Sequence, residues 1–156
     1  MRNDSGREFE GMFFRQQSGF FAGRYASEKE IWRMEPIRVL VVDDELFVGE
    51  LMQEYLTLSG YSVTTASNGK DALAAFSEIK PHIVVLDIRM PGMSGMDVLK
   101  TIKQDSPETG VVMLSAYGDP ETIVEALGAG ADHYLQKPVN LKHLVETLAL
   151  LHLQPK

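Results

Sequence analysis

Five polar residues stand at the ends of short, mostly apolar runs of the sequence: Asp43, Asp44, Asp87, Ser115 and Lys137. If the chain brings them together, they place three carboxylates, one hydroxyl and one ammonium group in one site. Two carboxylates about 4 Å apart repel each other by roughly 4 kcal/mol at an effective dielectric constant near 20. A cation or a proton must therefore balance the cluster. Oxygen ligands without His or Cys favour a hard ion, and a shallow site completed by water suits Mg²⁺ better than Ca²⁺.

Each of these residues also has an ordinary structural explanation. Asp44 could cap a helix that starts at Glu45, and Asp87 could begin a turn. The Ser115 hydroxyl could satisfy loose backbone groups, and Lys137 could be a solvated surface charge. The hypothesis of one shared site therefore depends on whether the elements before these residues end at the same edge of the fold.

Those elements follow a regular alternation. Short apolar runs predict strands at 37–42, 61–66, 82–87, 111–115 and 132–136, and apolar residues at helical spacing predict helices at 45–59, 69–79, 95–104, 119–127 and 140–152. Five strands that alternate with five helices indicate a mostly parallel sheet with helices on both faces. In such sheets ligands bind beyond the carboxyl ends of the strands. This rule places the five polar residues at one edge.

Composition narrows the classes of protein to consider. The chain has 156 residues and is 44% hydrophobic, which suits one domain with a real core. It contains no Cys, so disulfides, zinc–thiolate sites and thiol nucleophiles are excluded. No apolar run approaches the roughly 18 residues of a membrane span, and the N-terminus lacks the apolar segment of a signal peptide. We expect a cytoplasmic protein without membrane contact.

Charge is distributed unevenly along the chain. Residues 1–33 carry a net charge of +1, and residues 34–156 carry −8. An acidic body disfavours direct contact with nucleic-acid phosphates and suits cations or protein partners. Residues 1–35 are expected to be an N-terminal extension, and 36–153 the folded domain. The extension holds seven of the thirteen aromatic residues without helix or strand periodicity. This favours disorder or leader residues ahead of Met34, with an aromatic docking arm as the alternative.

Four segments carry a resemblance to a known family. They are VLVVDDE, VVLDIRMPGMSG, VVMLSAYGD and DHYLQKP. Together and in this order they resemble the receiver (REC) domain of two-component response regulators, from about Ile37 to His152. The resemblance implies an α/β fold of the (βα)₅ flavodoxin-like type, a doubly wound parallel sheet with strand order 2-1-3-4-5.

The resemblance also implies a chemical role for the carboxylates. Asp87 would be the phosphoacceptor, which takes a phosphoryl group from a phosphohistidine on a sensor histidine kinase or phosphotransfer protein, or from a small acyl phosphate. Asp44, Asp87 and the main-chain carbonyl of Arg89 would bind Mg²⁺ directly, and Asp43 would do so directly or through water. Beyond its own phosphorylation and dephosphorylation, the domain would catalyse no reaction.

Three further residues receive roles through the same resemblance. Lys137 would pair with Asp87 and later with the phosphoryl group, and its peptide bond to Pro138 would be cis. The Ser115 hydroxyl would turn toward the phosphoryl group, and Tyr134 would rotate into the vacated space. The surface formed by 119–127, 132–136 and 140–152 would then change, so that it meets a downstream protein target or a second copy of the chain in a phosphorylation-dependent dimer.

Other residues near the predicted site are given weaker roles. A long cation at Arg89 and a phenol at Tyr117 would slow the hydrolysis of the acyl phosphate, unless both simply point to solvent. Leu46 and Phe47 would contact a kinase helix if they are exposed. Glu45 is assigned to the first turn of the helix and not to the site. The four His residues have no spacing that suggests a metal site.

Three other interpretations remain open. The first is a phosphohydrolase of the haloacid dehalogenase type, which also uses Asp, Lys and Mg²⁺. Such enzymes carry a DxD motif on the first strand, whereas this chain has two adjacent Asp residues there. They usually also carry a cap insertion, for which this chain has no room. A receiver that serves only as an unphosphorylated interaction module is the second. The third is the receiver portion of a longer transcriptional regulator, because DIRMPGMSG and SAYGDPET are similar to receivers of nitrogen-regulation-type transcription factors.

Overall fold

A single parallel sheet organises the computed structural model, which describes residues 35–116 and 119–153. The strands are β1 (Arg38–Val42), β2 (Ser62–Ala66), β3 (Ile83–Asp87), β4 (Gly110–Ser115) and β5 (His133–Gln136). Their order is β2-β1-β3-β4-β5, and every neighbouring pair is parallel. The flavodoxin-like (βα)₅ fold and its strand order are therefore confirmed. Apart from Glu35, the predicted N-terminal extension lies outside the described residues.

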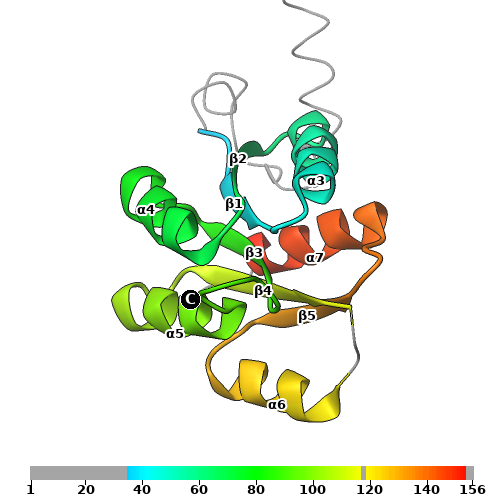
Figure 1. Ribbon diagram of the computed structural model, residues 1–156. Coiled ribbons are helices and arrows are strands. Elements are labelled where there is room, and N and C mark those ends of the chain that lie inside the picture. Colours follow the sequence, from blue (N-terminus) through cyan, green and yellow to red (C-terminus); the bar gives the residue numbers. More distant parts are fainter. Residues whose placement is uncertain (1–34, 117–118, 154–156) are drawn as a thin grey trace, which may run out of the picture. The chain divides into compact units, whose positions relative to one another are not determined.

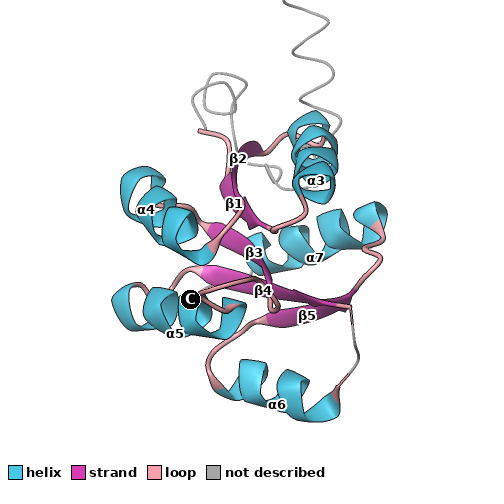
Figure 2. Cartoon of the chain, viewed as in Figure 1, coloured by secondary structure: helices cyan, strands magenta, loops and turns pink. Residues whose placement is uncertain are grey.

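Helices cover both faces of this sheet (Figures 1 and 2). They are α3 (Leu46–Leu58), α4 (Gly69–Ile79), α5 (Gly95–Asp105), α6 (Pro120–Gly128) and α7 (Leu141–Leu153). Helices α3 and α7 pack with alternate strand residues into one core, and α4, α5 and α6 contribute to a second core on the other face. Val39–Val42 are buried completely between the two cores. The continuous aliphatic runs are thus explained by burial on both faces.

Local signals in the sequence set where most helices begin. The side chains of Asn68 and Ser94 accept hydrogen bonds from backbone N–H groups in the first turns of α4 and α5. Asp119 does the same for α6, and Pro120 occupies the first helical position. Helix α3 differs, because Glu45 stands at its N-cap without a side-chain capping bond. None of the helices in the described ranges has the length and apolar character needed to cross a bilayer.

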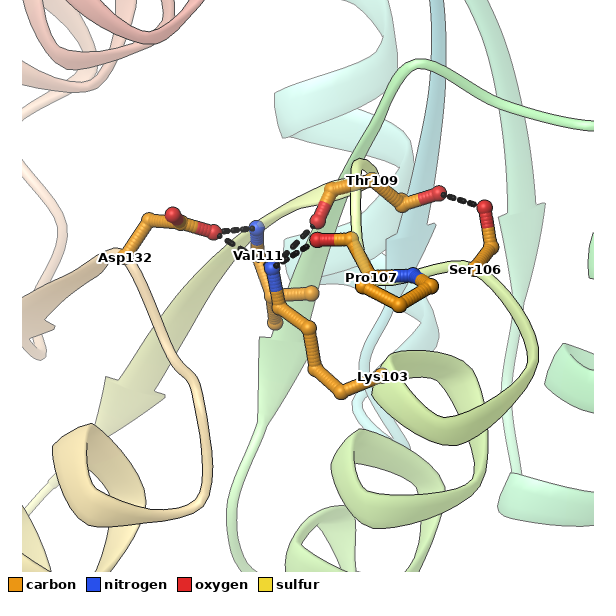
Figure 3. A network of polar contacts seen from close by, with 6 residues as sticks. All are labelled: Lys103, Ser106, Pro107, Thr109, Val111 and Asp132. Atoms are coloured by element: carbon orange, nitrogen blue, oxygen red, sulfur yellow. Dashed lines mark hydrogen bonds and ion pairs between the residues drawn. The ribbon is translucent and has the colours of Figure 1, made fainter. Parts of the chain in front are cut away.

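A polar network fastens the amino-terminal edge of the sheet (Figure 3). Lys103 on α5 donates to the carbonyl oxygen of Thr109 at 2.6 Å and to the Asp132 carboxylate at 2.9 Å. The same carboxylate oxygen of Asp132 accepts the backbone N–H of Val111 at 2.8 Å. One lysine and one aspartate thereby tie the end of α5, the start of β4 and the start of β5 together. The charged groups are largely buried, so their partners must be supplied within the protein.

At the opposite edge, α5 begins in close contact with the end of β3. A Cβ atom at Gly95 would overlap the carbonyl oxygen of Asp87 and would lie 2.7 Å from the Cα of Ile88. The backbone N–H of Gly95 donates to the carbonyl oxygen of Ile88 at 2.8 Å, which closes the intervening loop. Glycine is required here because the obstacle is main chain, which cannot move aside as a flexible side chain can.

Substituting Gly95 should therefore destabilise the domain. We expect Gly95→Ala to lower the free energy of unfolding by about 2 kcal/mol or more, because α5 must shift away from β3. Gly49→Ala is the matched control, since Gly49 lies within α3 and a Cβ there meets no atom within 4 Å. It should raise stability by up to about 1 kcal/mol through helix propensity. Urea unfolding followed by circular dichroism checks both, and equal effects would contradict the explanation.

Candidate functional site

The register of the strands brings the predicted polar residues to the carboxyl edge of the sheet. Val42 of β1 pairs with Leu86 of β3, so Asp43 and Asp87 follow at the same level. Asp87 pairs with Leu114 of β4, directly before Ser115. The backbone N–H of Lys137 then donates to the carbonyl oxygen of Ser115 at 2.8 Å, which carries the ladder past the end of β5.

The Lys137 ammonium group lies between the carboxylates of this edge. Its Nζ is 2.7 Å from Oδ2 of Asp43 and 3.0 Å from Oδ2 of Asp87. The Glu45 carboxylate, 3.9 Å away, is a third and more exposed neighbour. Pairing with Asp87 was expected from the resemblance, but the shorter contact with Asp43 was not. Glu45, which was assigned only to the helix, also borders the site.

The three aspartates form an oxygen cluster that is buried on one side. Asp43 and Asp87 are 2% and 5% exposed, and Asp44 beside them is exposed. Each offers a carboxylate oxygen, and these oxygens all lie within 4.8 Å of one another. Oδ1 of Asp43 accepts the backbone N–H of Glu45 at 2.9 Å, and its buried Oδ2 forms an ion pair with Nζ of Lys137 but has no hydrogen-bond partner among the described residues. The N-cap of α3 is Glu45, so Asp44 does not occupy the capping position considered for it.

Burial and charge act against each other on the ionisable groups. Burial raises the pKa of Asp87 above its usual value; the hydrogen bond and charge of Lys137 oppose this, and the Asp43 charge adds to it. Burial acts to lower the pKa of Lys137, but the hydrogen bonds and charges of Asp43 and Asp87 outweigh it, so the pKa is raised. Lys137 is therefore held as a cation. An added cation near Asp87 would favour its ionised form.

The donor set fits a hard divalent cation. The three carboxylates carry a formal charge of −3, and Lys137 offsets only one unit of it. At separations near 4.8 Å each carboxylate pair repels by roughly 3 to 4 kcal/mol at an effective dielectric constant near 20. The exposed Asp44 leaves a side of the cluster open to solvent, which suits an ion that keeps several waters. Oxygen ligands alone favour Mg²⁺ over softer metals.

The remaining predicted residues lie on neighbouring strands and loops, except for one that falls outside the described part of the chain. Ser115 is buried at the end of β4, and Tyr134 is half-buried against the core beneath α4, α5 and α6. The Lys137–Pro138 peptide bond is cis, as the resemblance implied. Arg89 is exposed, and its backbone N–H donates to Oδ1 of Asp87 at 3.2 Å. Tyr117, the other residue expected to slow hydrolysis, falls outside the described residues.

Comparison with known proteins agrees with this geometry. Residues 39–149 match the family model of the response regulator receiver domain. The probable transcriptional regulatory protein TcrX of Mycobacterium tuberculosis is 38% identical over 117 residues, which are 75% of this chain and 50% of TcrX. The chemotaxis protein CheY of Thermotoga maritima is 38% identical over 112 residues, 71% of this chain and 93% of CheY. The regulatory protein AtoC of Escherichia coli is 41% identical over 107 residues, 69% of this chain and 23% of AtoC.

Solved structures give the same picture. The chemotaxis protein CheY4 of Vibrio cholerae superimposes with a TM-score of 0.72 at 31% identity, covering 75% of this chain and 99% of CheY4. The chain thus spans nearly the whole length of the two chemotaxis proteins, but only half of TcrX and about a quarter of AtoC. The family match covers more than half of the chain, and the fold and strand order agree with it. The chain belongs to the response regulator receiver domain family.

Proposed function

We propose that this receiver domain is the phosphoacceptor of a two-component signal transduction system. It takes a phosphoryl group from a histidine kinase or phosphotransfer protein onto Asp87, with Mg²⁺ bound beside it, and then switches its α6-β5-α7 face. The observation that carries this proposal is the placement of Lys137 between the buried carboxylates of Asp43 and Asp87, with the exposed Asp44 alongside. A structural ion pair would need one carboxylate, whereas three supply oxygens for a cation and a carboxylate nucleophile for phosphorus.

The transfer itself needs little covalent chemistry from the protein. A carboxylate oxygen of Asp87 attacks phosphorus, and the bond from phosphorus to the imidazole nitrogen or acyl oxygen of the donor breaks, with its electron pair leaving on the donor. Lys137 is already 3.0 Å from Oδ2 of Asp87, so its charge can follow the phosphoryl oxygens without a large movement. Bound Mg²⁺ would neutralise charge on the equatorial phosphoryl oxygens.

Mg²⁺ binding is assigned to the aspartate cluster and to one main-chain carbonyl. Asp44 and Asp87 would bind directly together with the main-chain carbonyl of Arg89. Asp43 would bind directly or through water; its Oδ2 faces Lys137, as Oδ2 of Asp87 does. This set leaves positions for solvent and for one oxygen of the phosphoryl group.

Phosphorylation would then act through Ser115 and Tyr134. Met113 pairs with Tyr134 and Ser115 pairs with Gln136, so Ser115 and Tyr134 lie on the same face of neighbouring strands. A hydroxyl that turns toward the phosphoryl group leaves space on that face, and a half-buried phenol can fill it. The α6-β5-α7 face would in this way present a different surface to a downstream protein or to a second copy.

Residues at the start of α3 are assigned to the encounter with the kinase. Leu46 is 67% exposed and Phe47 is 75% exposed, and both follow the Asp43–Glu45 loop at the rim of the site. Large apolar side chains held in solvent beside a reactive group favour a partner surface. Their position would align the phosphohistidine of a kinase helix with Asp87.

Phosphorylation of Asp87 is directly testable. Incubation with Mg²⁺ and acetyl phosphate should add the mass of one phosphoryl group to the native chain and none to Asp87→Asn, because the amide is not a nucleophile. Asp105→Asn is the matched control, an exposed aspartate at the far end of α5, and it should be phosphorylated as the native chain is. Intact-mass spectrometry gives the result.

The same experiment separates the other interpretations. Many turnovers of acetyl phosphate by each protein molecule would support a phosphatase of the haloacid dehalogenase type. A native chain that gains no mass with Mg²⁺ present would support an unphosphorylated interaction module. Phosphorylation that persists in Asp87→Asn would show that another residue is the acceptor.

Mg²⁺ should stabilise the fold even without a phosphodonor. A ligand that binds only the folded state at one hundred times its dissociation constant adds about 2.7 kcal/mol to the free energy of unfolding. Asp44→Asn should remove most of this increment, whereas Asp97→Asn, an exposed aspartate on α5, should keep it. Thermal unfolding with Mg²⁺ and with EDTA measures the increment. An equal increment in both variants would contradict the assigned ligands.

Removing the Lys137 charge should be costly in the absence of metal. Lys137→Met leaves the buried carboxylates of Asp43 and Asp87 facing each other, and we expect a loss of about 3 kcal/mol in urea unfolding. Lys100→Met is the matched control, because its ion pair with Glu125 is more than half exposed and contributes less than about 1 kcal/mol. Adding Asp87→Asn to Lys137→Met should recover part of the loss, and no recovery would contradict the repulsion argument.

A further inference from the structure

The loop that follows Asp87 rests on the first residue of α4. Gly69 is buried there, and a Cβ atom on it would lie 2.8 Å from Cβ, 2.9 Å from Cγ and 3.0 Å from Sδ of Met93. These distances are shorter than ordinary carbon and sulfur contacts. The Met93 side chain therefore lies flat across the Cα of Gly69, in a position that any other residue at 69 would obstruct.

The other attachments of this loop lie nearer its base. Ile88 and Met90 are buried in the core shared with α4 and α5, and the exposed Arg89 lies between them. The base is closed by the hydrogen bond from Gly95 to Ile88. At the tip, Gly92 has a φ of +78°, a left-handed conformation that glycine adopts without strain.

The contact between Met93 and Gly69 ties the tip of the loop to a different helix. Met93 is 38% exposed, so burial alone does not fix its side chain. Gly69 directly follows Asn68, whose side chain accepts the Asp71 N–H and sets the start of α4. The tip is thus seated against a fixed end of a helix, while Arg89, between base and tip, points its N–H at Oδ1 of Asp87.

We propose that Met93, seated on Gly69, is a positioning residue that holds the 88–94 loop in the conformation that binds Mg²⁺. This inference rests on the proposed function, in which the main-chain carbonyl of Arg89 is a metal ligand. When the loop is held at both its base and its tip, the Arg89 carbonyl is already in position to bind the ion. When the loop is held only at its base, it must lose conformational entropy each time the ion binds. Met93 itself touches neither the ion nor the phosphoryl group.

The first test removes the Met93 side chain that packs on Gly69. In metal-free protein, Met93→Ala should speed hydrogen exchange at the amides of the 88–94 loop. Calorimetric titration of the full chain should show a dissociation constant for Mg²⁺ about tenfold higher, as is typical when a residue supporting a metal ligand is lost. At saturating Mg²⁺, Asp87 should still be phosphorylated by acetyl phosphate at close to the native rate.

Two variants distinguish positioning from general destabilisation. Met93→Leu keeps most of the volume over Gly69 and should restore both native exchange and native Mg²⁺ affinity. Leu150→Ala removes an exposed apolar side chain of similar size from α7 and should change neither. The proposal is wrong if Met93→Leu binds Mg²⁺ as weakly as Met93→Ala does. It is also wrong if Met93→Ala binds Mg²⁺ with the affinity of the native chain.

A double-mutant cycle tests the contact from its other side. Gly69→Ala should displace Met93 and also weaken Mg²⁺ binding. Met93→Ala removes Cγ and Sδ but keeps Cβ, the nearest of the three atoms, so Gly69→Ala should cost less in that background but still have an effect. If the effects of the two substitutions on Mg²⁺ affinity are additive, the proposed contact between Met93 and Gly69 is wrong. A native chain that binds Mg²⁺ without becoming phosphorylated would refute the proposed function alone, whereas one that binds no Mg²⁺ would overturn this inference together with the metal site.

Discussion

The ammonium group of Lys137 is the interaction on which the reactive edge of the sheet depends. It reaches from the end of β5 to a carboxylate that follows β1 and to one at the end of β3, at 2.7 Å and 3.0 Å. Two carboxylates held that close to each other in a largely buried position would destabilise the fold without a cation. The strand order makes the arrangement available, because β1 and β3 are neighbours at the point where the order of the sheet reverses.

The two edges of the sheet are built for different tasks. At the amino-terminal edge, Lys103 and Asp132 satisfy each other and the surrounding backbone groups (Figure 3). At the carboxyl edge the charges do not balance, and the surplus carboxylate Asp44 is exposed. A fully partnered network holds its elements in place, whereas an unbalanced one lowers its energy by binding a cation. The domain can therefore keep its strands fixed at one end and respond at the other.

Much of this was predictable from the sequence, and the exceptions have physical reasons. The strand and helix bounds agree to within about one residue, because buried strands and amphipathic helices leave direct marks on the apolar pattern. Strand order needed the family resemblance, since similar connection lengths serve several orders of the same five strands. The edge at which Asp43 and Lys137 meet was predictable, but their contact was not. Sequence places a side chain at an edge and does not choose its rotamer.

The packing of Met93 on Gly69 left no readable signal either. A glycine at the first position of a helix is ordinarily explained by backbone freedom, and a methionine in a loop by chance exposure. Here the glycine is needed for the space it leaves, which appears only when two segments far apart in the chain are placed side by side. The same limit applies to Gly95, whose close neighbour is the main chain at the end of β3.

The position of Lys137 near the end of the domain has a consequence for biosynthesis. Asp87 and Lys137 are 50 residues apart, and Asp43 precedes both. A ribosome releases the carboxylates first, and their counter-charge arrives only with the last strand. Contacts between residues so distant in sequence form slowly compared with local ones. Docking of β5 is then the step that neutralises the acidic edge, so a nascent chain acquires a complete receiver site only when its final strand has joined the sheet.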